Sequence, residues 1–225
     1  MLMDLRTTDF AQARDNMVDG QVRPNRVTDP RVIQAMRRLP RERFVPPAVA
    51  ALAYSDEDVP LGGGRYLIEP MVIARLVQAL RLRAGERVLV VAAGTGYGAA
   101  LAAACGAQVT ALEEDQALLA VAKPLLAELA PGVQVVSGPI GDGLAQGEPW
   151  HAILLDGAVR AIPPALGRQV GAGGRLTTVI TPPQGNGYAV LAEPSLRPGE
   201  LCAQPLFDCA TPPLPSLLPG PAFQF

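Results

Sequence analysis

The sequence predicts an α/β protein with a seven-stranded, mostly parallel sheet of the Rossmann-like type, preceded by a helical region and closed by an antiparallel hairpin. Short apolar runs typical of buried strands alternate with helical patterns from Val88 onward, and this alternation indicates βαβ units and a parallel sheet. A glycine-rich loop follows the first of these runs. The last two apolar segments follow each other without a helix, so we expect them to pair as a hairpin near Tyr188–Phe207.

The segment before the sheet is expected to be helical and irregular. Asp29 is the expected N-cap of a helix and Pro30 its first residue, because a side-chain oxygen satisfies the helix start and proline fits the first position. Pro40 is expected to end this helix, since the residue before a proline disfavours helical geometry. A short helix then runs through Ala53, and a loop containing three glycines, 62–64, follows it.

A cluster of basic residues lies around the end of that helix. It consists of Arg37, Arg38, Arg41 and Arg43. Charge runs of this kind usually form a solvated surface, so we expect a solvated helix face and its adjoining loop.

The sheet region begins after an amphipathic helix that opens at Pro70 and places Ile73, Val77 and Leu80 on one face. Strands and helices then alternate. The expected order is strand 88–91, helix 97–104, strand 109–112, helix 115–129, strand 133–138, strand 151–157, helix 163–171, strand 173–180, strand 188–194 and strand 201–209. The expected division is a helical N-terminal cap with a substrate-side loop over 1–70, and over 71–225 a Rossmann-like domain with the C-terminal hairpin and a proline-rich tail.

Composition excludes several classes of function. The net charge of −2 lacks the basic footprint of a nucleic-acid-binding protein. His151 is the only histidine, and the 3 cysteines lack metal-ligand spacing, so no metal site is expected. Sparse, odd-numbered cysteines suit a reducing compartment. No apolar run is long enough for a membrane span, and the N-terminus does not resemble a secretory signal. We therefore expect a cytoplasmic protein.

The loop after the first strand predicts a nucleoside-binding site. In this fold, ligands lie beyond the carboxyl ends of the strands. Gly94 and Gly96 let the backbone approach a ligand closely. Glu113 ends the second strand, where a carboxylate can accept hydrogen bonds from both hydroxyls of a ribose. The simpler alternative is a tight turn followed by a surface acid.

A second alternative comes from the same loop. Its sequence GTGYGA also satisfies the dinucleotide pattern G-x-G-x-x-G/A, which is found in NAD(P)-dependent oxidoreductases. Such folds usually start near the N-terminus and need a catalytic segment after the nucleotide-binding units. Here a long segment precedes the first strand and the chain ends in a hairpin, which favours a methyltransferase-like fold.

Several stretches resemble the protein-L-isoaspartate O-methyltransferase family. They are AYSDEDVPLGGGRYLIEP, VLVVAAGTGYGAALAA, VTALEED, PWHAILLDGAVRAIPPALGRQVGAGGRL and PLFDCATPPLP, together with MVDGQVRPNRVTDPRVIQAMRRLPRERFVP. The likeness covers nearly the whole chain, in the family's order and spacing. It implies binding of S-adenosyl-L-methionine and methyl transfer to the carboxylate of an isoaspartyl residue in a damaged protein or peptide. The cofactor-binding residues that it implies are Gly94, Thr95, Gly96, Glu113 and Gly138.

The chain departs from the family pattern on the acceptor side. The family's loop before the sheet usually reads threonine-isoleucine-serine-glutamine-proline, and its serine positions the substrate carboxylate. Counting back from Pro70, the serine position is Ile68 and the threonine position is Tyr66. Asp156 stands in a stretch where threonine and alanine are more usual, and it places a carboxylate at a strand end near the cofactor cleft. No catalytic residue is assigned, and Tyr66 and Asp156 are candidates.

The chain also departs from the pattern on the cofactor side. Val90 occupies the position of the family's usual first-strand acid, and Ala92 occupies the position of the first glycine of the loop. The family's glycine-aspartate-glycine falls on Gly138-Pro139-Ile140, so its adenine-facing aspartate is replaced by Pro139. A literal Gly-Asp-Gly lies three residues later, and its Asp142 compensates only if the loop is rebuilt.

Three interpretations follow from these matches and departures. The first is a methyltransferase of this family that acts on isoaspartyl residues. The second is a methyltransferase with a changed acceptor, favoured by Ile68, Tyr66 and Asp156. The third is a non-catalytic nucleoside-binding protein on the same scaffold, favoured by Val90, Ala92 and Pro139. We expect an S-adenosyl-L-methionine-dependent methyltransferase.

Overall fold

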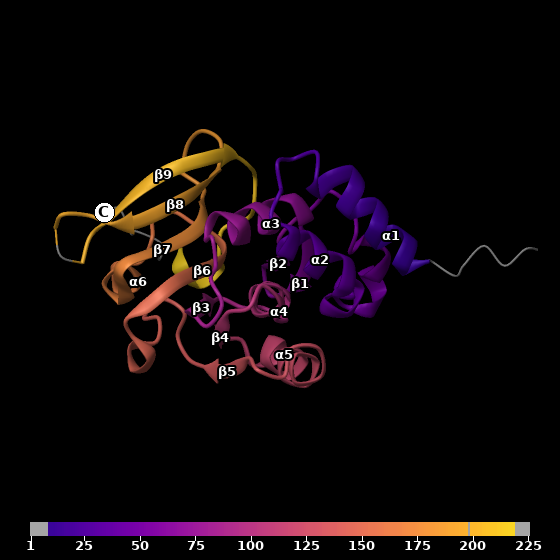
Figure 1. Ribbon diagram of the computed structural model, residues 1–225, viewed down its shortest axis with the longest axis horizontal. Coiled ribbons are helices and arrows are strands. Elements are labelled where there is room, and N and C mark those ends of the chain that lie inside the picture. The colour runs from indigo at the N-terminus through magenta and orange to yellow at the C-terminus, as the bar shows by residue number, and fades with distance from the viewer. Residues whose placement is uncertain (1–8, 198, 219–225) are drawn as a thin grey trace, which may run out of the picture.

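A computed structural model describes residues 9–197 and 199–218, so the first residues of the expected cap and the end of the proline-rich tail lie outside it. Within the described residues, seven strands form one sheet in the order β5-β4-β3-β6-β7-β8-β9 (Figure 1). The strands are β3 (Arg87–Val91), β4 (Gln108–Glu113), β5 (Gln134–Ser137), β6 (Trp150–Val159), β7 (Val170–Ile180), β8 (Tyr188–Pro194) and β9 (Leu201–Asp208).

The sheet is parallel from β5 to β7, while β8 runs antiparallel to both β7 and β9. The predicted mostly parallel sheet with an antiparallel final hairpin is therefore confirmed. The central strand β3 reads as an unbroken apolar run because both of its faces are covered. Val88, Leu89, Val90 and Val91 are each 0% exposed.

The register of the central strands fixes where the site lies. Val91, the last residue of β3, pairs with Leu112 of β4 on one side and Leu155 of β6 on the other. Glu113 and Asp156 each come one residue later. Glu113, the last residue of β4, and Asp156, which lies within β6, are therefore placed on either side of the loop that leaves β3.

Helices cover the two faces of the sheet unequally. One apolar core joins the sheet to α2 (Pro30–Arg38), α3 (Pro70–Ala79), α4 (Tyr97–Ala104) and α5 (Gln116–Leu129). The other face is covered by α6 (Pro164–Gln169) and by the C-terminal segment containing η5 (Pro215–Leu217). Asp115 caps α5, because its carboxylate accepts hydrogen bonds from the backbone of Ala117 at 2.8 Å and Leu118 at 3.2 Å.

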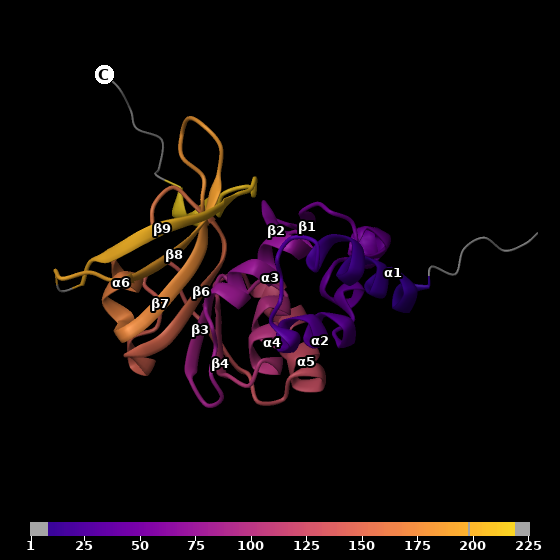
Figure 2. The same ribbon diagram turned by 45° about the horizontal axis from the view of Figure 1, so that its top comes forward.

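The N-terminal helices gather beside α3, α4 and α5, away from β8 and β9 (Figure 2). They comprise α1 (Phe10–Met17), a π-helical turn η1 (Val18–Val22), α2, and the 3₁₀ turns η2 (Arg41–Phe44) and η3 (Pro47–Leu52). Asp29 caps α2 as predicted, accepting a hydrogen bond from the backbone of Arg31 at 2.9 Å.

The expected glycine loop 62–64 is the turn of a small antiparallel hairpin. Its strands are β1 (Val59–Gly62) and β2 (Arg65–Leu67), and they pair with each other in a sheet separate from the main one. Gly63 and Gly64 have φ values of +58° and +74°, a region where side chains are strained. The sequence pattern showed the turn but not the strands, because each is only a few residues long.

The expectation of a solvated arginine cluster is wrong for Arg41, which is 0% exposed. Since α2 ends at Arg38, the 3₁₀ turn that follows directs this side chain inward. Its guanidinium donates to the backbone oxygens of Ala53 at 2.7 Å and Ile68 at 2.5 Å, and it stacks over the ring of Tyr97 at 4.8 Å. Its remaining nitrogen, Nη1, has no hydrogen-bond partner among the described residues.

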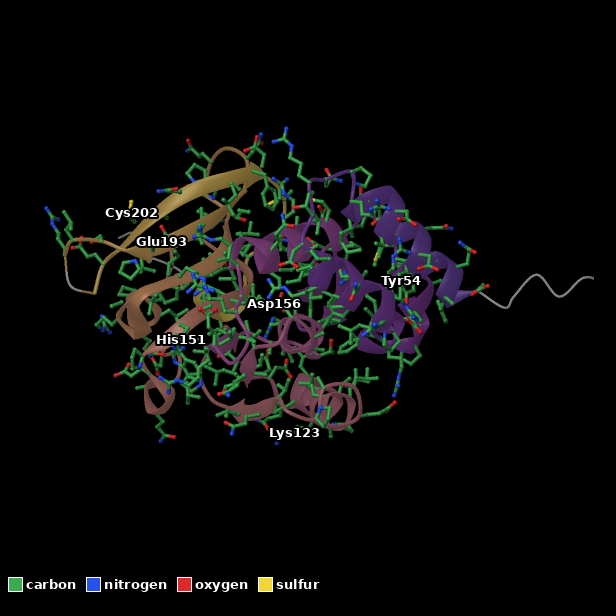
Figure 3. All side chains as sticks on the ribbon, viewed as in Figure 1. Tyr54, Lys123, His151, Asp156, Glu193 and Cys202 are labelled. Carbon is green, nitrogen blue, oxygen red and sulfur yellow. The ribbon has the colours of Figure 1, made fainter. Side chains whose placement is uncertain are left out.

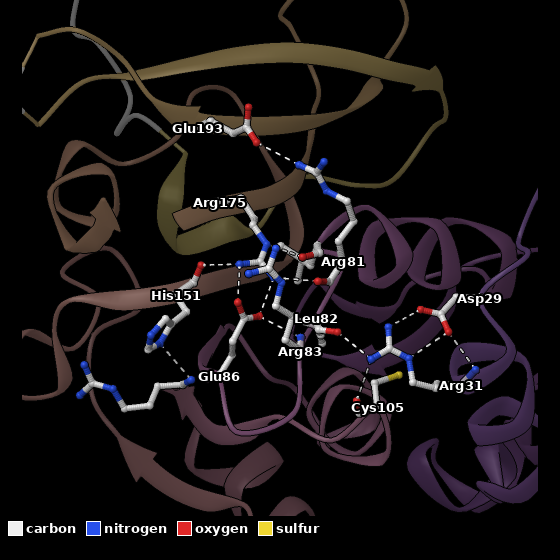
Figure 4. Close-up of polar contacts among 12 residues, drawn as sticks. Asp29, Arg31, Arg81, Leu82, Arg83, Glu86, Cys105, His151, Arg175 and Glu193 are labelled. Carbon is white, nitrogen blue, oxygen red and sulfur yellow. Dashed lines mark hydrogen bonds and ion pairs between the residues drawn. The ribbon is translucent and has the colours of Figure 1, made fainter. Parts of the chain in front are cut away.

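The amino ends of the strands are held by a polar network that does not involve the predicted site (Figure 4). Arg175 of β7 forms an ion pair with Glu86 at 2.6 Å and donates to the backbone oxygen of Arg81 at 3.0 Å. His151 accepts a hydrogen bond at Nδ1 from the backbone of Arg87 at 3.2 Å. These contacts join the strands to the loop that precedes β3.

Candidate functional site

The loop 92–96 leaves β3 and starts α4 with three residues in left-handed backbone geometry. The φ values are +58° for Ala92, +58° for Gly94 and +99° for Gly96. Glycine adopts this geometry without strain, whereas a residue with a Cβ pays about 1–2 kcal/mol. Ala92 therefore has the backbone of the glycine that the family pattern places there, with the strain of a side chain added.

The loop is buried beneath neighbouring elements. A Cβ on Gly94 would contact Leu61 of the β1–β2 hairpin, and one on Gly96 would overlap Leu126 of α5. Thr95 is 4% exposed, and its hydroxyl donates to the backbone oxygen of Phe44 at 2.6 Å. The hairpin and the N-terminal segment thus close over the loop, and the Thr95 hydroxyl already has a partner within the chain.

Glu113 anchors the loop to the end of β4 and is 0% exposed. One carboxylate oxygen, Oε2, accepts from the backbone of Gly94 at 2.7 Å. The other, Oε1, accepts from the backbone of Glu114 at 2.9 Å and Asp115 at 3.0 Å. A cation completes the set, because Arg65 donates to Oε1 at 2.8 Å and to Oε2 at 2.9 Å.

Arg65 was not predicted as a site residue. It is the first residue of β2, is 7% exposed, and also donates to the backbone oxygen of Ala92 at 3.0 Å. Its bidentate pair with Glu113 is of the strong kind, since two parallel charge-assisted hydrogen bonds form in a buried setting. The one sequence feature that could have indicated its role is a single arginine directly after three glycines. Its partner, Glu113, lies 48 residues away in sequence.

Asp156 lies in the second half of β6, near the centre of the molecule (Figure 3). Its carboxylate abuts Gly98 of α4, where a Cβ would overlap Oδ2. Burial raises its pKa to about 7; Arg65 and Arg41 oppose the rise, while Glu113 and Asp58 add to it. Within the described part of the chain it has neither a hydrogen bond nor an ion pair.

The two residues at the predicted acceptor positions differ in their exposure to solvent. Ile68 is 1% exposed and belongs to the core. Tyr66 is 36% exposed and lies on β2 opposite Pro60. The structure therefore brings Glu113, Asp156 and the loop together around Arg65, but it does not bring the Tyr66 side chain into that buried group.

Further acids lie close to Ile68. Glu69 is half-buried, and burial raises its pKa to about 7, with Asp56 and Asp58 adding to the rise. Burial also raises the pKa of Asp58, which accepts a hydrogen bond from the Glu69 backbone at 2.8 Å. Burial raises the pKa of the neighbouring Cys209 thiol to about 12, and Glu69 and Asp58 contribute to that rise.

A cavity of about 630 Å³ opens beside Cys209. It is lined by Thr181, by 185–187 and by 208–213. Because β7 ends at Ile180, the cavity lies at the carboxyl end of the sheet, where ligands of this fold bind. Glu69 and Asp58 do not line this cavity, but they lie near enough to its lining residue Cys209 to raise the pKa of that thiol.

The turn after β5 brings one predicted residue, Gly138, next to Glu113. Gly138 donates its N–H to the backbone oxygen of Glu113 at 3.1 Å. Ile140 is 0% exposed and donates to Glu114 at 3.2 Å. Asp142 is exposed. Its backbone oxygen accepts a hydrogen bond from the side chain of Gln169 of α6 at 2.7 Å, so Asp142 is held next to α6 rather than next to Glu113.

The part of the chain that the structure describes contains neither a candidate metal site nor a candidate membrane-spanning helix. No group of three or more histidine, cysteine, aspartate or glutamate residues there could hold a metal ion. Over the same residues, no helix has the length and apolar character needed to cross a membrane.

Comparison with known families gives a match over most of the chain. Residues 12–195 match the family model for protein-L-isoaspartate(D-aspartate) O-methyltransferase. The protein-L-isoaspartate O-methyltransferase of Methylorubrum populi is 42% identical over 178 residues, covering 79% of this chain and 83% of the relative. That of Koribacter versatilis is 36% identical over 208 residues, covering 92% of both chains.

Solved structures agree in fold. A protein-L-isoaspartate O-methyltransferase superposes with a TM-score of 0.76 at 22% identity, covering 91% of this chain and 67% of that one. A Plasmodium falciparum protein described as a methyltransferase of the same type, solved with S-adenosyl-L-homocysteine, superposes with a TM-score of 0.73 at 17% identity, covering 90% of this chain and 98% of that one. The methyltransferase interpretation is favoured over the oxidoreductase and the non-catalytic alternatives.

Proposed function

The chain belongs to the protein-L-isoaspartate(D-aspartate) O-methyltransferase family, whose members use S-adenosyl-L-methionine, and we propose that it methylates a carboxylate of an isoaspartyl residue in damaged proteins or peptides. The observation that carries this proposal is the family match over 12–195, with relatives 36–43% identical. The chain is a methyltransferase by that membership.

The residues of the loop fit the cofactor in most respects. We propose that Gly94, Thr95, Gly96, Glu113 and Gly138 hold it. Left-handed glycines leave the backbone of the loop free of side chains, and a strand-end carboxylate is present where a ribose requires one. The cofactor supplies a sulfonium methyl group when bound. The conflict that the structure adds is Arg65, which already holds both oxygens of Glu113.

A carboxylate acceptor requires little proton chemistry from the chain. It is already ionised and nucleophilic near pH 7, because the pKa of an ordinary side-chain carboxyl is about 4. The work of the chain is then to position the acceptor and to exclude water from it. Ile68 contributes apolar surface at the position of the family's serine, so a hydroxyl that would steady the acceptor is missing.

A second candidate function has a specific observation behind it. An anionic acceptor would approach Glu69, Asp58 and Asp156, and none of these has an ion-pair partner among the described residues. A neutral acceptor, such as a hydroxyl or an amine, would avoid that repulsion. Asp156, with its pKa raised to about 7, suits the acceptance of a proton from such a group.

The proposal extends to organisation and location. We propose residues 1–70 as the acceptor-side cap and 71–225 as the methyltransferase domain, since the hairpin that closes the loop belongs to the former. A cytoplasmic location is supported by the free thiols of Cys105, Cys202 and Cys209. A shift of electrophoretic mobility in non-reducing gels of protein taken directly from cells would contradict that location.

The experiment that tests the function is transfer of labelled methyl groups from S-adenosyl-L-methionine. The acceptors are an isoaspartyl peptide and its ordinary aspartyl counterpart, and the product is measured as base-labile methyl ester. Ester formation on the isoaspartyl peptide alone is the expected result. Base-stable methylation of a hydroxyl or amine acceptor, without ester, would support the second candidate instead.

A further inference from the structure

We propose that Arg65 is an internal competitor of the cofactor, and that its guanidinium moves from Glu113 to Asp156 when the ribose of the cofactor binds. The inference rests on the proposed cofactor role of Glu113. It goes further, because it names the ion pair that must break before the Glu113 carboxylate can bind a ribose.

The competition follows from the hydrogen bonds at Glu113. A carboxylate offers about four lone-pair sites on its two oxygens. Three backbone N–H groups and two nitrogens of Arg65 already occupy them. The backbone donors are fixed by the ends of β4 and by the loop. Arg65 is the one side-chain donor, so it is the group that can leave. Its departure frees a site on Oε2, which then keeps only the backbone donor of Gly94, for a hydroxyl of a ribose.

Asp156 is the receiver that the geometry offers. Glu113 ends β4 and Asp156 follows Leu155 of β6, on opposite sides of β3. Arg65 also donates to the backbone oxygen of Ala92 at 3.0 Å, directly after β3 and therefore between the two acids. Its guanidinium can pivot about that contact toward either side.

The charge around Asp156 supports the same destination. Arg65 is the first of the two cations that favour its ionised form, the other being Arg41. Glu113 and Asp58 disfavour that form. A guanidinium arriving from Glu113 would give Asp156 the direct partner that it lacks among the described residues, and a displaced buried cation would otherwise have none.

The element carrying Arg65 is separate from the main sheet. The β1–β2 hairpin pairs only with itself, and its Leu61 lies over Gly94. Two-stranded hairpins are marginal on their own, so this one depends on its contacts with the loop and on the ion pair. Release of Arg65 therefore loosens the hairpin over the same loop that the cofactor approaches.

The test is calorimetric titration of four proteins with S-adenosyl-L-homocysteine. They are the natural chain, Arg65→Gln, Asp156→Asn and the double variant. Arg65→Gln should bind about tenfold tighter or more, because no cation has to leave Glu113. Asp156→Asn should bind several-fold weaker, because the displaced Arg65 has no receiver. The double variant should match Arg65→Gln, since Asp156 matters only while Arg65 is present.

Control variants and contrary outcomes separate this inference from the proposed function. Arg43→Gln removes an exposed ion pair with Glu128 and should leave the affinity unchanged. Arg65→Lys keeps the charge without the bidentate geometry and should lie between the natural chain and Arg65→Gln, with thermal melts confirming that each variant is folded. Equal affinity of the natural chain and Arg65→Gln would overturn the competition alone, and a persisting Asp156→Asn effect in the double variant would overturn the transfer. Absence of binding in all four would contradict the cofactor role and this inference together.

Discussion

The carboxylate of Asp156 lies against the Cα of Gly98, so the missing side chain in the first turn of α4 makes the space that the acid occupies. The two residues come from strand β6 and from the helix after the glycine loop. Their contact therefore links Asp156, a proposed acceptor-side residue, to the helix that follows the proposed cofactor loop.

Gly98→Ala should destabilise the protein by about 1–3 kcal/mol, because the added methyl overlaps Asp156 and overpacking costs that much. Helix propensity alone would give the opposite sign, since alanine stabilises a helix by about 1 kcal/mol relative to glycine. The measurement is chemical denaturation. Gly20→Ala is the matched control, because nothing lies within 4 Å of a Cβ there. Equal changes at both positions would show that Asp156 does not fill the space.

Ala92→Gly should stabilise the protein by about 1 kcal/mol, because Ala92 holds a left-handed backbone at φ +58°. The matched control is Ala93→Gly, the next residue of the same loop, where φ is not positive and 3% of the residue is exposed. That substitution should destabilise, since it loses a buried methyl and adds chain entropy. Denaturant midpoints check both, and a loss of stability in Ala92→Gly would contradict the strain.

Stability should fall as pH rises toward 7. Asp156 and Glu69 have their pKa values raised to about 7 from 3.8 and 4.5, chiefly by burial. The folded chain therefore binds these protons more tightly than the unfolded chain. Between about pH 4 and 7 the unfolded chain releases them first, so the free energy of unfolding decreases over that window and levels off above it.

Urea denaturation at pH 5 and pH 8 checks this dependence. Asp156→Asn should flatten it by about 2 kcal/mol or more, because the amide does not titrate. Glu128→Gln is the control, since Glu128 is exposed and the ion pair with Arg43 lowers its pKa. A pH dependence unchanged in Asp156→Asn would mean that this carboxyl keeps its ordinary pKa.

Ile68→Ser should cost about 2–4 kcal/mol of stability, because Ile68 is 1% exposed and a cavity with a buried hydroxyl replaces it. If the serine position of the family faces the acceptor, the variant should also form isoaspartyl ester about tenfold faster at saturating cofactor. Ile68→Val removes a methylene without adding a hydroxyl and should show no gain. Brisk ester formation by the natural chain would show that a serine is not needed there.

The elements that the sequence predicted well have local causes. The β3 strand and the cap at Asp29 follow from an apolar run and a side-chain oxygen within a few residues of the element they define. The glycine loop after β3 was recognisable for the same reason, since glycines mark left-handed turns. Such signals do not depend on how distant segments meet.

The features that the sequence did not predict depend on distant partners. Arg41 was expected at the surface, but a turn after α2 and two backbone oxygens from other segments bury it. Arg65 lies 48 residues before Glu113, and nothing near it in sequence indicates that it forms an ion pair with an acid. The ion pair between Arg65 and Glu113 therefore could not be predicted from the local sequence.

The most direct test of the central claim is binding of S-adenosyl-L-homocysteine, with NADH as the comparison ligand, to the natural chain and to Glu113→Gln. We predict saturable binding of S-adenosyl-L-homocysteine to the natural chain, none of NADH, and a loss of about 1.5–3 kcal/mol of binding free energy in Glu113→Gln, as expected for hydrogen bonds to a charged group. A thermal melt confirms that the variant is folded. Binding of NADH without S-adenosyl-L-homocysteine, or unchanged affinity in Glu113→Gln, would contradict the claim that this carboxylate holds the ribose of a methyltransferase cofactor.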